Sequence, residues 1–311
     1  MAGTGLDGTG TDRTGTDWTD HPGATTIRAV DTDVSPARRL RDAIEPLAMV
    51  TVWSDAAARE REAAGLDLLA GYVGGRASVL GDVEGAVVAA TFGVWAPGFL
   101  HDLWARARAA RTIAQLRDAR VRAGSRALRD ALDGVDTDDV EAVVGTLRSA
   151  LTGAAVVGRP LFAGQAALPW PDDPHGRLWH ATSLLREHRG DSHLGACVAA
   201  GLDAIEVNVL TELWVGYGLL EYTATRGWSP DAMEGAVERL RERGLLDGSR
   251  LSDQGRRVRD GVEEATDRAQ RPLVEALGTA LDPLVTTLDR WADAVLARGW
   301  FPDDRAKRAA G

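Results

Sequence analysis

Apolar residues recur at helical spacing along most of the chain. Leu40, Ile44 and Leu47 follow Ser35 at intervals that place them on one helix face, which predicts a helix over 36–50 with Ser35 as its cap. The same spacing predicts further amphipathic or buried helices over 54–65, 66–80, 83–95, 97–107, 112–132 and 138–151. No segment in the first 244 residues alternates polar and apolar positions, so we expect an all-helical N-terminal half.

Polar and proline-rich segments mark the expected boundaries. Residues 1–34 repeat Gly, Thr and Asp with hardly any apolar residue, and such a segment cannot offset the entropy lost on ordering, so we expect a disordered tail. Pro160 and the prolines from Pro169 to Pro174 interrupt the helical pattern and predict an extended, proline-rich linker over 159–174. The expected domains are a helical domain over 35–158 and a second domain over 175–303.

The C-terminal half shows a second pattern of elements. An apolar helix is expected over about 194–214, and Ser229 followed by Pro230 reads as the cap and first residue of another helix. Two short apolar-bearing segments around the Asp247-Gly248 turn predict a tight β-hairpin. Long helices are expected to close the chain, one from Asp253 and one over about 282–297.

Composition narrows the class of protein. With 311 residues, 44% of them hydrophobic, the chain is long enough for one large core or two smaller ones. No run of about 18 apolar residues and no signal-like N-terminus is present, so we expect a cytoplasmic protein with no membrane partner. The net charge of −10 argues against a protein that coats nucleic acid. The single cysteine, Cys197, has small apolar neighbours and is interpreted as a buried, inert thiol.

Residues 180–193 concentrate chemistry-bearing side chains, including three of the six histidines. In a helix, His180 and Glu187 differ by only about 20° of rotation and therefore share a face. Gly190 is expected to end this helix and Asp191 or Ser192 to cap the next one, which would place the cluster at a corner between two helices. The candidate ligand-binding residues of this cluster are His180, Arg186, Glu187, His188, Arg189, Asp191 and His193.

Four interpretations of this cluster are compatible with the residues. A metal site is disfavoured because the spacing matches no standard zinc pattern, and we predict neither a metal nor a cofactor. A histidine tuned by Glu187 or Asp191 would give an acid/base site, although no catalytic residue can be assigned. Arg186 and Arg189 would instead bind a carboxylate or phenolate. In the fourth interpretation, the charged residues form a structural network of ion pairs and caps.

Three further residues outside the cluster are candidates for ligand binding. Arg76 follows two glycines, which permit either a close helix contact or a backbone approach to a ligand that pairs with Arg76. Trp95 and Trp179 would supply aromatic faces to a ligand pocket, although tryptophans of this kind also build cores.

Two runs in the C-terminal half carry a family resemblance. They are Val237-Glu238-Arg239-Leu240-Arg241-Glu242-Arg243-Gly244-Leu245-Leu246 and Leu251-Ser252-Asp253-Gln254-Gly255-Arg256. Together they resemble the recognition helix, the wing and the start of the following helix in winged helix-turn-helix proteins of the MarR type, over about residues 194–270. The whole chain also resembles a bacterial family that joins such a winged helix to a helical N-terminal half, which implies an architecture and no activity.

The resemblance implies a fold and a mode of action. The expected fold is mainly α, with a helical N-terminal domain, a winged helix-turn-helix with a small β-hairpin wing, and long C-terminal helices. The expected protein is a homodimeric, ligand-responsive regulator that binds DNA through its recognition helix and a small aromatic or anionic molecule between its two halves. Arg226, Arg239 and Arg250 are then the candidate DNA contacts.

Acidic residues in the same segment support an alternative function. Asp231, Glu234 and Glu238 occupy positions that should approach DNA, where carboxylates are repelled by phosphate and are useful only against cytosine. The wing is short, with Arg250 as its only cation. The alternative is an enzyme or small-molecule-binding protein that uses the winged helix only as a scaffold, with residues 180–193 as its site.

Overall fold

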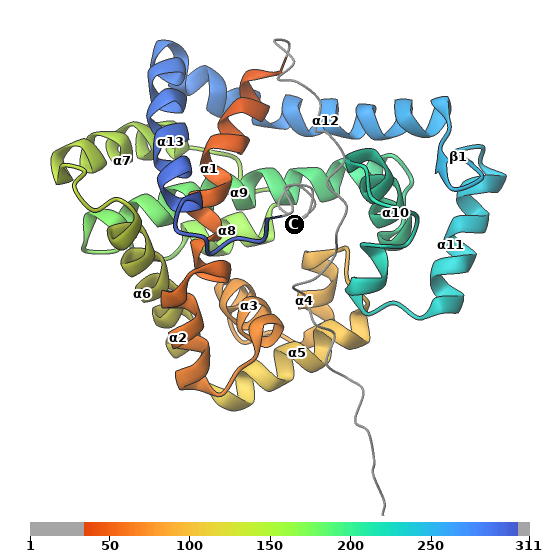
Figure 1. The fold of residues 1–311 in the computed structure, drawn as a ribbon, viewed down its shortest axis with the longest axis horizontal. Helices are drawn as coiled ribbons and strands as arrows, with labels where there is room; N and C mark the ends of the chain where they lie inside the picture. Colours follow the sequence, from red (N-terminus) through yellow and green to blue (C-terminus); the bar gives the residue numbers. More distant parts are fainter. Residues whose placement is uncertain (1–33, 304–311) are drawn as a thin grey trace, which may run out of the picture. The chain divides into compact units, whose positions relative to one another are not determined.

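The computed structural model describes residues 34–303, so the predicted tail lies outside the described residues except for Val34. The described chain is mainly α-helical with one two-stranded antiparallel hairpin, which confirms the mainly α expectation (Figure 1). The first helices are α1 (Pro36–Trp53), α2 (Asp55–Ala64), α3 (Leu68–Ala77), α4 (Gly85–Phe92), α5 (Pro97–Ala110), α6 (Ile113–Ala131), α7 (Thr137–Leu151) and α8 (Pro160–Ala166). The later helices are α9 (Pro174–Ala199), α10 (Ala204–Val215), α11 (Pro230–Glu242), α12 (Asp253–Leu277) and α13 (Leu281–Leu296), with short 3₁₀ turns η1 (Ser78–Leu80), η2 (Thr223–Arg226) and η3 (Gly278–Ala280) and strands β1 (Leu246–Asp247) and β2 (Arg250–Leu251).

Local sequence signals account for many of these elements. The side chains of Ser35 and Ser229 each accept a backbone N–H at the start of α1 and α11, as the sequence predicts, and those of Thr112 and Asp136 do the same for α6 and α7. The predicted helix over 194–214 is instead two helices, because the side chain of Asp203 caps α10 after a break. The local apolar pattern therefore predicts where helices form, whereas the position of a helix end also depends on capping residues such as Asp203.

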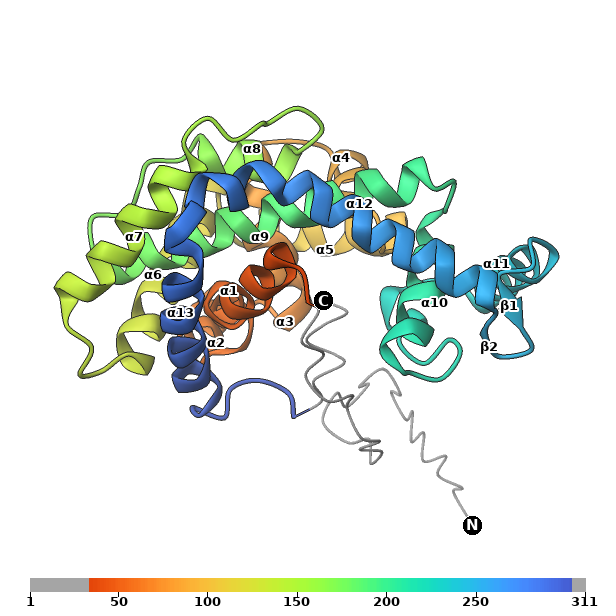
Figure 2. The same ribbon diagram turned by 90° about the horizontal axis from the view of Figure 1, so that it is seen from above.

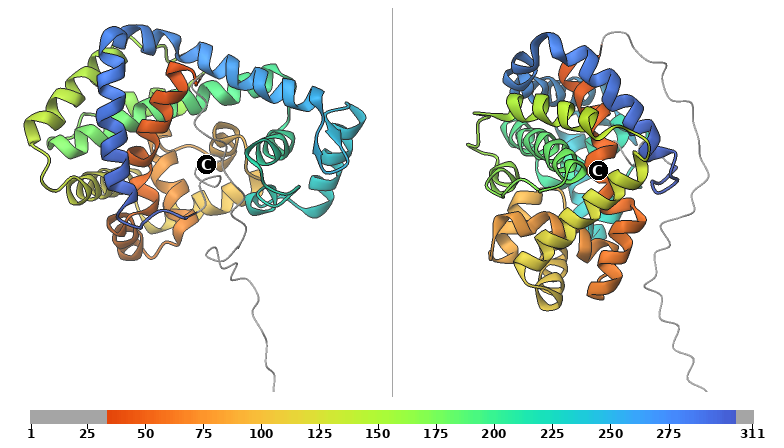
Figure 3. Two further views of the ribbon diagram at one scale, coloured as in Figure 1. Left: turned by 45° about the horizontal axis from the view of Figure 1, so that its top comes forward. Right: turned by 90° about the vertical axis from the view of Figure 1, so that its left-hand side faces the viewer.

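Helix α9 is the central element of the fold. It packs against α1, α6, α7, α8 and α12, and Figures 1 and 3 show it lying between α12 and the group α3 to α5. Charged and polar side chains in its middle are buried along with its apolar ones. Because other helices cover most sides of α9, its buried charged residues need ion-pair or hydrogen-bond partners on those helices to offset the cost of burial.

Helix α9 runs without interruption through Gly190, so the predicted corner at this glycine is wrong. Glycine within a helix costs only about 1 kcal/mol relative to alanine, and the packing around α9 outweighs that preference. Gly190 also lies beside α3, since a methyl group at this position would come 3.7 Å from Arg76 Nη2. No second helix begins at Asp191, which lies inside α9.

The predicted extended linker over 159–174 contains a helix. Residues Pro160–Ala166 form α8, and Leu161, Phe162 and Gln165 are buried. Pro160 occupies the first helical position, where the missing N–H is not needed, so proline starts this helix rather than excluding it. The division into domains over 35–158 and 175–303 stays a prediction.

The C-terminal elements share a separate hydrophobic core. Met233, Ala236, Val237 and Leu240 form the buried face of α11, and they pack with residues of α10 and the hairpin. Figure 2 shows α11 and the hairpin at the N-terminal end of α12. In the hairpin Leu246 pairs with Leu251 and Asp247 with Arg250, as the Asp-Gly turn predicts.

Gly255 allows α12 to pack closely against Leu245, the residue before β1. A methyl group at this position would lie 2.0 Å from the carbonyl oxygen of Leu245, so only glycine allows this approach. Among the described residues, no single helix is long and apolar enough to cross a membrane, and α9 with α10 passes that test only as a pair bent by 109°.

Candidate ligand-binding site

A pocket of about 480 Å³ lies among α1, α2, α3 and α6, with Arg186 of α9 also lining it. Its volume is within the range of small-molecule sites. The pocket is thus built mainly from the N-terminal helices, and none of its lining residues comes from α10, α11 or the hairpin. Arg76, Arg120 and Arg186 form a charged floor around a buried carboxylate of α9.

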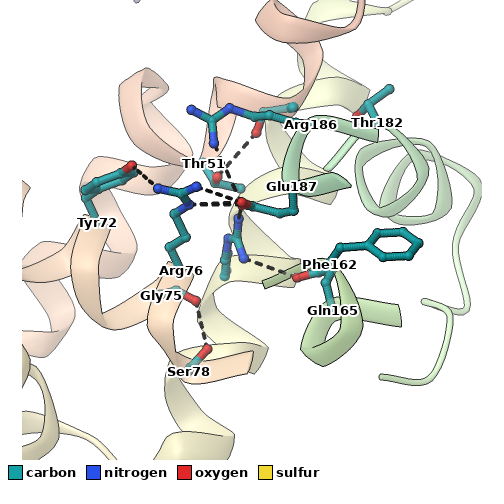
Figure 4. Close-up of polar contacts among 12 residues, drawn as sticks. Thr51, Tyr72, Gly75, Arg76, Ser78, Phe162, Gln165, Thr182, Arg186 and Glu187 are labelled. Carbon is teal, nitrogen blue, oxygen red and sulfur yellow. Dashed lines mark hydrogen bonds and ion pairs between the residues drawn. The ribbon is translucent and has the colours of Figure 1, made fainter. Parts of the chain in front are cut away.

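This carboxylate belongs to Glu187, which is 1% exposed. Arg76 binds it with Nε 3.1 Å from both oxygens and with Nη2 2.8 Å from Oε2 (Figure 4). The remaining nitrogen of Arg76, Nη1, donates to the hydroxyl of Tyr72 at 3.0 Å. Arg76 is therefore fully engaged by groups of the protein, with the ring of Phe92 4.7 Å from its guanidinium carbon.

Two further arginines share Glu187. Arg120 Nη2 lies 3.4 Å from Glu187 Oε1, while its Nη1 donates to Gln165 Oε1 at 3.2 Å. Arg186 Nη1 lies 3.7 Å from the same Glu187 oxygen, and its Nε donates to Glu45 Oε1 at 3.0 Å. We call Arg76, Arg120, Arg186 and Glu187 the Glu187 cluster.

The electrostatics of this cluster keep its carboxylate charged. Burial alone would raise the pKa of Glu187, but Arg76 and Arg186 outweigh burial and lower this pKa to about 2. The pKa of Tyr72 is likewise lowered from its ordinary value, since burial, which raises it, is outweighed by Arg76 and Arg186. Glu187 is therefore a fixed anion at neutral pH and not a general acid or base.

The sequence indicated only part of this cluster. Arg76 stood out because it follows a pair of glycines, and Arg186 and Glu187 belong to the histidine-rich stretch. A methyl group on Gly74 would come 2.5 Å from Ala107, so this glycine serves close packing of α3 on α5. Arg120 and Tyr72 carried no signal, because Arg120 is one of several arginines on α6 and its burial depends on tertiary packing.

The three histidines of the stretch lie in separate environments, and none lines the pocket. Their Nδ1 atoms lie 2.9 Å from Gln165 for His180, 2.9 Å from Gln270 for His188 and 3.2 Å from Thr266 for His193. Burial lowers the pKa of each to about 4. At neutral pH they are uncharged, and the structure does not bring them together.

Arg189 and Asp191 join α9 to other helices. Arg189 donates to Asp267 at 2.7 Å and to Glu263 at 3.0 Å, which ties α9 to α12. Asp191 Oδ2 accepts the backbone N–H of Phe162 at 2.9 Å in the first turn of α8, and burial raises its pKa to about 6. These contacts are the ion pairs and caps of the structural interpretation.

The two candidate tryptophans are also outside the pocket lining. Trp179 is buried, donates to the carbonyl of Ala48 at 3.3 Å and lies 5.2 Å from the guanidinium carbon of Arg120. Trp95 is buried beside Arg226. Within residues 34–303, no group of three or more His, Cys, Asp or Glu side chains is arranged to hold a metal.

The three candidate DNA contacts differ in their surroundings. The guanidinium carbon of Arg226 lies 4.2 Å from the ring centre of Trp95 and 4.1 Å from that of Tyr222, and burial lowers its pKa to about 10. Arg239 pairs with acidic residues of α10 and its cap, whereas Arg250 is exposed on the hairpin. Arg226 therefore packs against the N-terminal helices rather than on the outer face of α11.

The outer face of α11 is exposed along its length. Asp231, Glu234, Glu238 and Arg241 are all exposed, opposite the buried apolar face. At the start of α12, Arg256 and Arg257 are exposed as well. DNA-binding helix-turn-helix proteins place the exposed face of one such helix in the major groove.

Comparison with known families agrees with this geometry. The profile of a helix-turn-helix family matches residues 37–302. Because the match covers nearly all of the described chain, the protein belongs to this helix-turn-helix family. No curated protein and no solved structure matches the chain.

Proposed function

We propose that this protein is a ligand-responsive regulator whose DNA-binding unit is a winged helix of the MarR type. In this proposal α11 is the recognition helix, the hairpin is the wing, and a small molecule in the pocket controls DNA affinity. The observation that carries it is the exposed outer face of α11 in a chain of a helix-turn-helix family. A homodimer would present two such helices to successive major grooves.

The charges around α11 favour contacts with the DNA backbone. Arg250, Arg256 and Arg257 are exposed near the hairpin and supply cations for phosphates. The carboxylates on the outer face of α11 leave few donors for base edges, so affinity would depend mainly on these arginines. Binding is then expected to be weak at physiological salt and strongly salt-dependent.

A direct link connects the pocket region to this unit. The backbone N–H of Ala96 donates to the carbonyl of Arg226 at 2.9 Å. Asn208 and Trp228 donate to the carbonyl of Val94 at 2.6 and 3.3 Å. Phe92, a few residues earlier, contacts Arg76 of the Glu187 cluster. A change at the pocket floor therefore has a short path to α10 and η2.

DNA from upstream of the protein's own gene tests this proposal by fluorescence anisotropy at low salt. Binding should weaken uniformly across sequences in Arg257→Ala, and the salt slope should fall by about 1 for that lost phosphate contact. Arg126→Ala, on the exposed side of α6, is a matched control and should bind like the wild type. If the wild type does not raise the anisotropy of this DNA at low salt, the proposed regulator is refuted.

The acidic outer face of α11 favours a second candidate function. In it, the protein binds or transforms a small molecule and the helix-turn-helix is a scaffold. The residues first considered for that site do not act as one group, since only Arg186 lines the pocket and only Glu187 joins it at the floor. Ligand binding without any DNA binding, at every salt concentration tested, would favour this candidate.

A further inference from the structure

The two halves of the chain repeat one order of elements. In the first half α1 and α2 are followed by α3, α4, α5, α6 and α7, and in the second half α9 is followed by α10, η2, α11, α12 and α13. The matching pairs are thus α1 with α9, α3 with α10, α5 with α11, α6 with α12 and α7 with α13. A proline in the first turn opens two of these pairs: Pro36 of α1 with Pro174 of α9, and Pro97 of α5 with Pro230 of α11.

A repeated sequence marks the same place in both halves. Residues 63–67 and residues 199–203 both read Ala-Ala-Gly-Leu-Asp. In each copy the glycine follows the end of a helix with a left-handed backbone, at φ 66° for Gly65 and φ 68° for Gly201. The aspartate side chain then caps the next helix by accepting backbone N–H groups, Asp67 for α3 and Asp203 for α10. Identical residues therefore have identical local roles at matching points of the fold.

The packing of the helices also repeats when the two halves are exchanged. Helix α1 packs against its own counterpart, α9 (Figures 1 and 3). Helix α1 also packs against α13 and α6, and α9 packs against their counterparts α7 and α12. In the same way α6 packs against α9 and α13, while α12 packs against α1 and α7. Reciprocal contacts of this kind are the property of a two-fold interface between identical subunits.

The surface on which the halves meet is a hydrophobic core. Ile44 and Leu47 of α1 belong to the same buried cluster as Leu288 and Trp291 of α13, and all four are at most 5% exposed. The first half of the chain therefore covers the apolar face of α13, which is not available to a second copy. The large hydrophobic side chains left exposed among the described residues lie outside α12 and α13: Val87, Val156, Val157 and Val198.

The two halves differ at the helices that would meet DNA. Helix α11 has a free outer face and is followed by the hairpin, whereas the connection from α5 to α6 contains no strand. The first turn of α5 is also covered by the second half, because a methyl group on Gly227 would lie 2.6 Å from the ring of Phe99. Recognition helices contact base edges with their N-terminal residues, so α5 is blocked at the end where α11 is open.

We propose that the chain is an internal duplication of one helical unit, in which residues 36–151 take the place that a second copy has in a homodimer. The protein is then a monomer that presents one recognition helix, α11, and binds a single half-site. The half-site rests on the proposed function, in which the N-terminal half now replaces the second copy. The pairing of the two halves rests on the fold alone.

Sedimentation equilibrium and thermal unfolding of the full chain test the pairing without DNA. The mass should stay at 33.1 kDa. The Tm should not change over about a hundredfold range of protein concentration, because the Tm of an obligate homodimer rises with concentration and that of an internal pair does not. Leu288→Ala, at the surface between the halves, should lower Tm by roughly 5–10 °C without changing the mass. Val157→Ala, at a side chain that is 87% exposed, is the matched control and should change neither.

Native mass spectrometry with short duplexes from the upstream DNA counts the chains on each site. One chain should occupy a duplex of about one helical turn, about 10 bp. The inference is overturned if the protein has twice its monomer mass, if Tm rises with concentration, if Leu288→Ala leaves Tm unchanged, or if two chains occupy one such duplex. A monomer with a concentration-independent Tm that binds no DNA would refute only the proposed regulator.

Discussion

Replacement of Glu187 by glutamine is the most demanding test of the charged floor. Glutamine has nearly the same shape but removes the only carboxylate that Arg76 and Arg120 share. The lowering of the Glu187 pKa from 4.5 to about 2 corresponds to about 3 kcal/mol in favour of the ionised form. Removing one partner of a buried ion pair costs about 3–5 kcal/mol, which for a chain of this length lowers Tm by roughly 10 °C.

Thermal unfolding followed by circular dichroism between pH 3 and pH 8 measures this loss. Because the folded pKa of Glu187 lies below its unfolded value, its stabilisation is present above pH 4.5 and disappears as the pH falls toward 2. The gap between wild type and Glu187→Gln should therefore be widest near neutral pH and narrow below pH 4.5. Glu238→Gln, on the exposed face of α11, should leave Tm unchanged.

An added organic anion sharpens the test. In Glu187→Gln, Arg76 and Arg120 both lack their shared carboxylate, so an added organic anion should raise Tm by more degrees in the variant than in the wild type. A Glu187→Gln protein that melts within about 2 °C of the wild type would refute the reasoning, because the floor would then not need its internal anion.

Three other predictions follow from the buried groups and from close packing. Asp191→Asn should keep the hydrogen bond from the backbone N–H of Phe162. Because burial raises the pKa of Asp191 to about 6, the wild type loses stability as the pH rises through that value, so the variant should be more stable than the wild type at pH 8 and equal to it at pH 4. An equal Tm of the two proteins at both pH values would contradict this. Burial lowers the pKa values of His180, His188 and His193 from 6.5 to about 4, so NMR should show all three neutral at pH 6. The stability of the protein should fall as the pH drops from 6.5 toward 4. Titration of all three above pH 6 would count against the buried geometry. Gly255→Ala should lower the free energy of unfolding by about 2 kcal/mol or more, measured by denaturant, because its methyl group would overlap the Leu245 carbonyl. Gly261→Ala has open space around it in the same helix and should raise that free energy by up to about 1 kcal/mol. The reverse order would disprove the contact.

Local signals predicted a large share of the fold. The caps Ser35 and Ser229 and the Asp-Gly turn of the hairpin act within a few residues, so their structure could be predicted from the sequence. Gly190 misled for the same reason: as a local signal it favours a helix end, and only the packing around α9 overrides it. Pro160 was likewise taken as a breaker although it starts α8.

The candidate site was predictable only in part, because it is assembled from distant segments. Glu187 and Arg76 are 111 positions apart, and Glu187 and Arg120 are 67 apart, so no spacing rule connects them. The histidines attracted attention by their number, yet each is satisfied separately. The arginines of α6 look alike in the sequence, and only the fold decides that Arg120 is buried beside Glu187 while Arg126 is exposed.

The continuity of α9 has a mechanical consequence. Glu187 at the pocket floor and Cys197 in the core beneath α10 and α11 belong to one unbroken helix, separated by about 15 Å of helical rise. A corner at Gly190 would have acted as a hinge that absorbs motion. Without that corner, a tilt or axial shift of α9 at Glu187 would be carried along the rigid helix to Cys197, so under the proposed function α9 itself would connect the pocket to the helix-turn-helix.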